Sequence, residues 1–161
     1  MIEIFRDDDI NWLTNAALFK SVNDLFKKYD KQHWCGVLFE HLFDNYETSH
    51  LLCSEGNIRI AWHGWNHKNY GKVSYETCNE DIKKSLNYWD ENCQRRYGKK
   101  IPVTKAFPPW HSVSSDFARA CKDNGIILDA RENTPVYCFH YWNCIEDSRL
   151  QELEKWLREC E

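Results

Sequence analysis

Residues 2–10 read Ile2-Glu3-Ile4-Phe5-Arg6-Asp7-Asp8-Asp9-Ile10, a short apolar run that ends in three consecutive aspartates. The apolar residues predict a β-strand over residues 2–6. One aspartate would be enough to cap a helix beginning at Asn11 or Trp12, which is the plainer interpretation of the run. Three adjacent carboxylates repel one another, so we expect a positive charge to offset them. A divalent metal ion is the simplest candidate.

Two histidines lie four residues apart further along the chain, in Ala61-Trp62-His63-Gly64-Trp65-Asn66-His67. In one turn of helix both rings would point to the same side, but Gly64 and Asn66 also favour a tight turn. Alone, such a pair is more typical of surface histidines. Together with one aspartate it makes three ligands with open positions, as in catalytic zinc sites. Iron(II) oxygenases also use two histidines and a carboxylate, but commonly as His-x-Asp on an all-β fold, which this chain does not offer.

Short strand patterns alternate with helical patterns along the chain, which predicts a parallel sheet or a barrel. The predicted strands are residues 2–6, 35–39, 58–62, 102–107, 126–128 and 136–139. The predicted helices are residues 12–29, 74–97, 114–125 and 147–159, and residues 40–53 are ambiguous. The polar motifs follow strands one, three, four and six, and the last of them contains His140. Because the carboxyl ends of parallel strands meet at one edge, we expect one active site there.

Length, composition and charge argue against several classes of protein. The chain has 161 residues, enough for one domain, and its eight tryptophans and eight tyrosines suggest aromatic side chains on a groove as well as in the core. A net charge of −4 without a basic stripe argues against nucleic-acid binding, and no apolar run is long enough to cross a membrane. The first residues do not form a signal peptide, so we expect a cytoplasmic protein whose eight scattered cysteines are free thiols.

The ordered motifs resemble those of the polysaccharide deacetylases, carbohydrate esterase family 4, also called NodB-type deacetylases. Arg6-Asp7-Asp8-Asp9 resembles the first motif of that family and His63-Gly64-Trp65-Asn66-His67 the second. Phe107-Pro108-Pro109-Trp110 resembles the third and Phe139-His140-Tyr141-Trp142 the last. The resemblance extends from Phe5 to Trp142 and implies a compact, divergent member. It also implies one catalytic domain over residues 1–161, built as a distorted, incomplete β/α barrel of about six parallel strands with surrounding helices.

The resemblance implies roles for particular residues. Asp8 would be the catalytic base and His140 the acid, while Asp9, His63 and His67 would hold a divalent metal, usually zinc in this family. The pair Asp7 and Asp8 is an alternative to Asp8 and Asp9. The main-chain N–H of Trp110 would help to hold an oxyanion. Substrate-binding residues would be Pro109, Trp110, Trp65 and Trp142.

The resulting prediction is a metal-dependent hydrolase that removes an acyl group, N-acetyl above all, from a carbohydrate substrate that carries acyl groups. Two departures from the family pattern matter: Phe107 stands where the family usually has arginine, and Ile10 stands where it has glycine. The family arginine orients the base, so here we expect Arg6 or Arg131 to orient Asp8. The missing arginine and the short chain also keep open a non-catalytic carbohydrate-binding relative of the deacetylases.

Overall fold

Six parallel strands form one curled sheet in the computed structural model, which describes residues 2–131 and 135–160. The strand order is β5-β4-β3-β2-β1-β6, so the first strand lies between the second and the last. The strands are β1 (Ile4–Ile10), β2 (His33–Leu38), β3 (Ile58–Gly64), β4 (Val103–Ala106), β5 (Ile127–Leu128) and β6 (Val136–Phe139). Every adjacent pair is parallel, so all the carboxyl ends lie at the same edge. The incomplete β/α barrel predicted from the sequence is confirmed.

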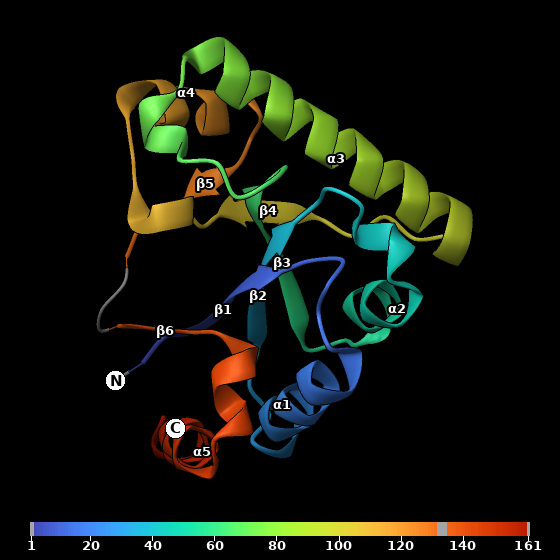
Figure 1. Ribbon diagram of the computed structural model, residues 1–161, viewed down its shortest axis with the longest axis vertical. Helices are drawn as coiled ribbons and strands as arrows, with labels where there is room; N and C mark the ends of the chain where they lie inside the picture. Colours follow the sequence, from blue (N-terminus) through green and yellow to red (C-terminus); the bar gives the residue numbers. More distant parts are fainter. Residues whose placement is uncertain (1, 132–134, 161) are drawn as a thin grey trace.

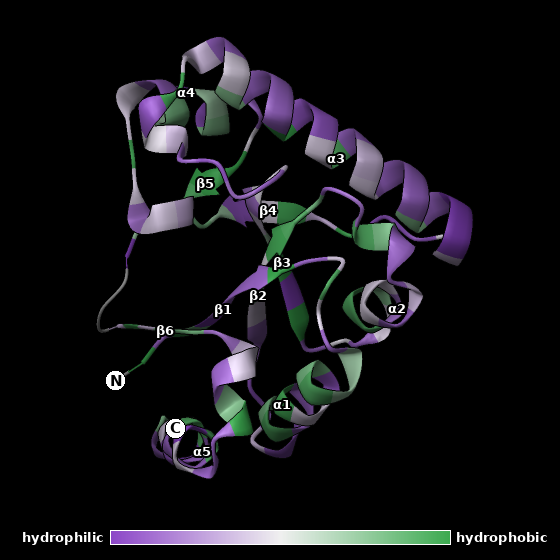
Figure 2. Ribbon diagram, viewed as in Figure 1, coloured by the Kyte–Doolittle hydropathy of each residue, from purple (hydrophilic) through white to green (hydrophobic). Residues whose placement is uncertain are grey.

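Five α-helices surround the sheet (Figure 1). They are α1 (Ala16–Lys28), α2 (Tyr46–Ser54), α3 (Tyr75–Tyr97), α4 (Ser115–Asp123) and α5 (Asp147–Glu159). In the described part of the chain, four short 3₁₀ helices each lie between a strand and the helix that follows it: η1 (Leu42–Asp44), η2 (Tyr70–Lys72), η3 (Pro109–His111) and η4 (Tyr141–Ile145). The long helix α3 presents a largely polar outer side (Figure 2). Among the described helices, none combines the length and apolar content needed to cross a membrane.

Two groups of buried residues lie on the two sides of the sheet. The larger one joins the strands to the helices, for example through Phe5, Trp62 and Phe26, and supplies most of the buried apolar area. The smaller one consists of Ile4, Ala61, Phe107 and Val136, with Trp34 packed against it. Since none of its members belongs to a helix, this smaller group marks the inner side of the curl. Ile4, Arg6 and Asp8 of β1 therefore point inward, whereas Ile10, beyond a register shift, packs in the larger group.

Two boundary predictions near the N-terminus were wrong. The aspartates lie inside β1, not after it, because pairing with β2 continues to Ile10, which faces Val37 after a register shift. The first helix begins at Ala16 and not at Trp12. Its N-cap is Asn15, whose side chain accepts from the Leu18 N–H. The ambiguous segment 40–53 becomes η1 followed by α2.

The other helix ends follow the sequence closely. Ser74 and Ser114 cap α3 and α4 by accepting from the N–H groups of Thr77 and Phe117. Gly98 ends α3 with a φ of 61°, a left-handed conformation that glycine adopts without a Cβ clash. Helix α5 has the predicted bounds, 147–159. All eight cysteines are free thiols, as expected.

Candidate active site

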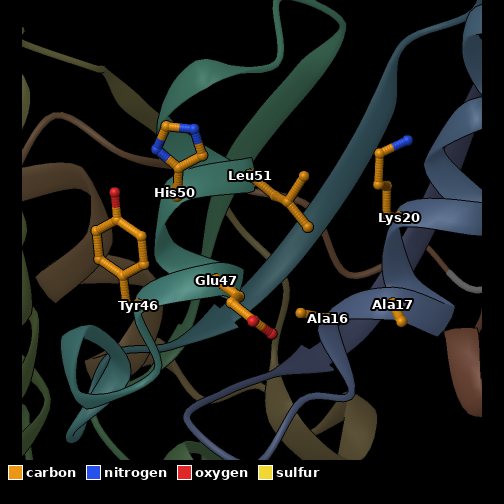
Figure 3. A pocket seen from close by; sticks show the side chains of 7 residues that line it. All are labelled: Ala16, Ala17, Lys20, Tyr46, Glu47, His50 and Leu51. Atoms are coloured by element: carbon orange, nitrogen blue, oxygen red, sulfur yellow. The ribbon is translucent and has the colours of Figure 1, made fainter.

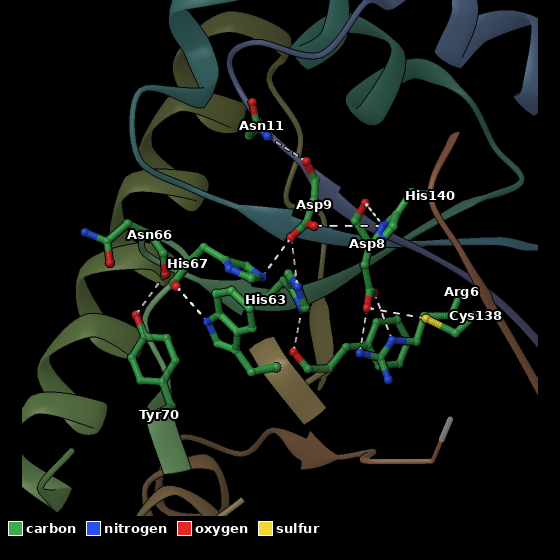
Figure 4. Close-up of polar contacts among 12 residues, drawn as sticks. Arg6, Asp8, Asp9, Asn11, His63, Asn66, His67, Tyr70, Cys138 and His140 are labelled. Carbon is green, nitrogen blue, oxygen red and sulfur yellow. Dashed lines mark hydrogen bonds and ion pairs between the residues drawn. The ribbon is translucent and has the colours of Figure 1, made fainter. Parts of the chain in front are cut away.

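Asp9, His63 and His67 converge at the carboxyl edge of the sheet (Figure 4). Oδ1 of Asp9 lies 3.1 Å from Nε2 of His63 and 3.1 Å from Nε2 of His67. His63 belongs to β3, whereas His67 lies in the bend that follows it, so the pair is held by a turn and not by a helix. The three ligand atoms lie within 4.8 Å of one another, close enough to share one cation.

Neighbouring groups orient both imidazoles. The carbonyl oxygen of Phe107 lies 2.7 Å from Nδ1 of His63, so Nδ1–H donates to it and Nε2 is directed at Asp9. The ring of His67 lies against Trp110, with 4.9 Å between centroids, and the Trp110 indole N–H donates to the His67 carbonyl at 3.2 Å. Such second contacts fix the tautomer and direction of metal-binding histidines.

The state of Asp9 fits a bound cation. Its Oδ1 is buried yet makes no hydrogen bond, although such atoms normally find a partner. Its backbone φ of 66° is unusual for a residue with a side chain, and such strain concentrates at functional sites. Burial alone would raise the pKa of Asp9, but the two imidazoles outweigh it and hold that pKa well below its usual value. An ionised oxygen facing two ring nitrogens is a suitable ligand set for zinc or a similar divalent metal.

Asp8 forms an ion pair with Arg6 of the same strand. Nε of Arg6 donates to Oδ1 at 2.8 Å, and Nη2 lies 2.6 Å from Oδ2. The side chains are 0% and 2% exposed. The guanidinium also lies over the ring of Phe107, 4.5 Å from its centroid. Arg6 therefore orients Asp8, while Arg131 instead pairs with Asp129 and reaches the Arg6 side chain only through its carbonyl oxygen.

The inner side of the curl is crowded around Asp8. A Cβ added at Gly36 would lie 2.5 Å from Oδ1 of Asp8, so only glycine fits at that point of β2. The thiol of Cys138 in β6 lies 3.6 Å from Oδ2. Burial would raise the pKa of Asp8, but the charge of His63 and the Arg6 hydrogen bond lower it below its usual value. Asp8 is thus an ionised carboxylate in a fixed orientation.

His140 follows β6 and completes the cleft. Its Nδ1 lies 3.3 Å from the carbonyl oxygen of Asp8 and 3.9 Å from Oδ2 of Asp9. Its ring stacks on Trp142, with 4.5 Å between centroids and 8° between planes. The cleft has a volume of about 290 Å³ and is lined by Asp8, Asp9, His63, His67, Pro108, Trp110, His111 and His140. The predicted catalytic and metal-binding residues therefore share one cavity.

Asp7 points away from this cleft. Its Oδ1 accepts from the Tyr141 N–H at 2.8 Å, and its Oδ2 lies 3.1 Å from Nε2 of His33. Burial raises the pKa of Asp7 well above its usual value and lowers that of His33 to about 3. Because Tyr141 directly follows His140, the contact ties the first strand to the segment that carries that histidine.

The predicted substrate-binding residues do not all line the cleft at the strand ends. Trp110 lines the cleft and is 65% exposed, and Trp142 reaches it through the stack on His140. Pro109 is buried, and Pro108 lines the cleft in its place. Trp65 lines a neighbouring cleft that shares His67. Sequence reasoning missed Cys138 beside Asp8 and His111 in the cleft lining, since neither has a local pattern that sets it apart.

A separate depression of about 260 Å³ lies between α1 and α2 (Figure 3). Ala16, Ala17 and Leu51 contribute apolar side chains to it, and Tyr46 and His50 stand at one side. None of its residues lines the cleft at the strand ends.

Solved structures of family 4 carbohydrate esterases superimpose on this chain over almost its full length. The chain has the fold of the family 4 carbohydrate esterases. Peptidoglycan deacetylase PdaC from Bacillus subtilis matches with a TM-score of 0.71 and 15% identity over 97% of this chain and 82% of its own. A family 4 carbohydrate esterase from Bacillus anthracis matches with a TM-score of 0.70 and 18% identity, covering 97% and 75% of the two chains.

The same fold also occurs in a pseudoenzyme. BA3943, a family 4 pseudoenzyme from Bacillus anthracis, matches with a TM-score of 0.71 and 12% identity, and this chain spans 60% of its length. No protein-family model and no curated protein sequence matches this chain. At these identities the likeness establishes the deacetylase fold, and function has to be argued from the site.

Proposed function

We propose that this protein is a metal-dependent hydrolase that removes an acyl group, in the first instance N-acetyl, from a carbohydrate. The observation that carries the proposal is the convergence of Asp9 Oδ1 with the Nε2 atoms of His63 and His67, beside an ionised Asp8 in one cleft. Carboxylate, two imidazoles and a separate fixed carboxylate are the parts that hydrolysis by activated water requires. The deacetylase fold is consistent with it.

Each residue has a definite task in this reaction. Zinc or a similar metal held by Asp9, His63 and His67 would supply Lewis acidity to the acyl carbonyl and the attacking water. Asp8 accepts the proton that the water loses, and Arg6 keeps the carboxylate ionised and correctly turned. Each oxygen of Asp8 has two lone pairs, so the contacts to Arg6 leave acceptor capacity for that water.

His140 is the candidate acid. Its Nδ1–H donates to the Asp8 carbonyl oxygen, which leaves Nε2 as the nitrogen that gives a proton to the departing amine. The stack on Trp142 restricts the ring to one plane. Trp110 stands at the mouth of the cleft with most of its surface in solvent, and a flat indole suits the apolar face of a sugar ring.

The test is acetate release from N-acetylated chito-oligosaccharides by the zinc-loaded protein, with and without chelator. Asp8→Asn should lower kcat by at least ~10²-fold while the protein keeps its metal, because only the base is removed. His67→Ala should lose the metal itself, measured by elemental analysis of the purified protein. Asp24→Asn on the exposed side of α1 is the control and should change neither quantity. Metal at one equivalent without acetate release from any substrate would contradict the proposal.

That outcome would favour the second candidate, a non-catalytic carbohydrate-binding relative. The observation in its favour is the near-complete burial of Asp8, both of whose oxygens already contact Arg6. A pseudoenzyme with the same fold shows that the architecture persists without activity. Glycan binding that survives Asp8→Asn, with no turnover by the parent protein, would identify this class.

A further inference from the structure

The bend that carries His67, residues 65–70, receives little support from its own side chains. Among the described residues, Oδ1 of Asn66 and Oδ1 of Asn69 are buried without a hydrogen-bond partner, although asparagines often hold turns through this atom. The bend follows Gly64, which has a φ of 133° and where a Cβ would lie 2.4 Å from the Asn66 carbonyl oxygen. Contacts from outside the bend therefore have to fix the position of His67.

Asp81 of helix α3 makes such contacts on both sides of His67. Its Oδ2 accepts from Nζ of Lys68 at 2.8 Å and from the Tyr70 hydroxyl at 3.0 Å. The oxygen of that hydroxyl accepts from the Trp65 N–H at 3.2 Å, and Figure 4 shows the Tyr70 side chain directed at the bend. One carboxylate oxygen thus connects α3 to the start and the end of the bend.

The link through Tyr70 is the stronger of the two because it is shielded from water. Asp81 is 9% exposed and Tyr70 is fully buried. Burial, and after it the charge of Asp81, raise the pKa of Tyr70 above its usual value, so the hydroxyl keeps the proton that it donates. A hydrogen bond to a carboxylate is about twice as strong as one between neutral groups. The side chain of Lys68 is 40% exposed, so solvent weakens its contact with Asp81.

The two histidines reach Asp9 by different means. His63 lies in strand β3, is 2% exposed, and has its Nδ1–H held by the Phe107 carbonyl oxygen. The side chain of His67 is 32% exposed, and Trp110, which donates to its carbonyl oxygen, stands largely in solvent. The sheet therefore fixes the first imidazole, whereas the second is only as well placed as its bend.

We propose that Asp81 is a positioning residue for the metal site, because by holding the bend through Tyr70 and Lys68 it keeps Nε2 of His67 directed at Asp9. Without Asp81 all three ligands remain, but a metal ion has to order the bend when it binds, which weakens its affinity. Contacts behind the ligands of a metal typically change its affinity by about 10–100-fold. The inference rests on the metal ligands of the proposed function but not on hydrolysis.

The test measures the dissociation constant of the full-length protein for zinc by competition with a chromophoric chelator. Asp81→Ala should raise this constant about tenfold or more, and Tyr70→Phe, which removes only the hydroxyl, should raise it by a smaller factor. Asn92→Ala is the matched control, since Asn92 lies on the same helix, is 8% exposed, and contacts Tyr88 and Arg95 away from the bend. The control should leave the zinc affinity unchanged.

A spectrum separates positioning from a general loss of stability. The visible absorption of the cobalt(II)-loaded protein reports the arrangement of the ligands, and it should change in Asp81→Ala but not in Asn92→Ala. Urea unfolding with chelator shows how far each variant is destabilised. An equal loss of zinc affinity in Asn92→Ala, at a similar loss of stability, would mean that Asp81 is merely structural and would overturn the inference.

Acetate release by the parent protein distinguishes this inference from the hydrolase. Unchanged zinc affinity in Asp81→Ala, or in Tyr70→Phe if Asp81→Ala does not fold, overturns the inference even if the parent releases acetate. Weaker zinc binding in these variants, without acetate release by the parent, upholds the inference and contradicts the hydrolase. A parent protein that binds no zinc contradicts both.

Discussion

Replacing Arg6 with methionine tests the central electrostatic claim about the site. The side chain keeps its length and apolar stem but loses the guanidinium that contacts both oxygens of Asp8, at 2.8 and 2.6 Å. The thiol of Cys138, a weak donor 3.6 Å from Oδ2, then remains as a side-chain contact of the carboxylate. A carboxylate that is 2% exposed would be left without a charged partner on its own strand.

The expected loss is large because both groups are buried. Breaking a buried ion pair by removing one partner costs about 3–5 kcal/mol, since the other charge stays desolvated. Arg6 also stacks on Phe107, which adds lost contact area. Arg131→Met provides the matched control, because Arg131 is 45% exposed and its partner Asp129 keeps Lys105 at 3.3 Å. A pair in which one partner is so exposed contributes little to the free energy of unfolding.

Urea unfolding in the presence of chelator measures the free energy of unfolding of Arg6→Met and of Arg131→Met. The double variant Arg6→Met with Asp8→Asn should lose at least about 2 kcal/mol less than the sum of the two single variants, because no ionised carboxylate remains unpaired. If Arg6→Met and Arg131→Met cost the same, or if the double variant is simply additive, the claim that Arg6 stabilises an ionised Asp8 is wrong.

Three further predictions concern other parts of the fold. Gly36→Ala places a Cβ 2.5 Å from a buried carboxylate oxygen and should abolish acetate release and lower thermal stability, whereas Gly56→Ala, with nothing within 4 Å, should leave both unchanged. Oxidation by glutathione disulfide should join Cys53 to Cys93, whose Sγ atoms lie 3.5 Å apart. The cross-link should raise the free energy of unfolding by about 3–4 kcal/mol. Peptide mapping that finds no bond between these two cysteines would contradict the prediction. Arg131 and then Lys105 lower the pKa of Asp129 to about 2, so this carboxylate adds stability above pH about 4 that is lost as the pH falls towards 2. Asp129→Asn should therefore lower the free energy of unfolding at neutral pH by about 1–2 kcal/mol relative to the parent protein. The gap between the two proteins should shrink as the pH falls towards 2, as measured by urea unfolding across that range.

Local sequence signals were enough to predict most of the fold. Helix α5 and strand β6 have the predicted bounds, and the serine caps of α3 and α4 lie where the sequence indicates. These features depend on contacts between residues a few positions apart, which is why a single sequence reveals them. The error at the start of α1 has the same origin, because Asn15 and the turn before it compete with Trp12 as a helix start.

Contacts between distant segments could not be predicted in the same way. Nothing near Phe107 in the sequence indicates that its ring covers Arg6 or that its carbonyl orients His63. The pairing of His33 with Asp7 depends on the order of strands in the sheet, because β2 lies directly beside β1. Motif order predicted that the polar residues meet at one edge, but only the packed structure assigns a neighbour to each.

The three consecutive aspartates can have different surroundings only because the strand is distorted where they lie. In a regular strand Asp7 and Asp9 would share one side of the sheet, and Asp8 would take the other. The left-handed backbone at Asp9, with a φ of 66°, and the register shift between Asp7 and Ile10 break that alternation. Asp7 remains on the helix-covered side with His33, Asp8 points inward to Arg6, and Asp9 turns towards the imidazoles at the edge. Mutual repulsion of the three charges is relieved because each has its own compensation: burial with a raised pKa for Asp7, a guanidinium for Asp8, and for Asp9 two histidines with room for a cation.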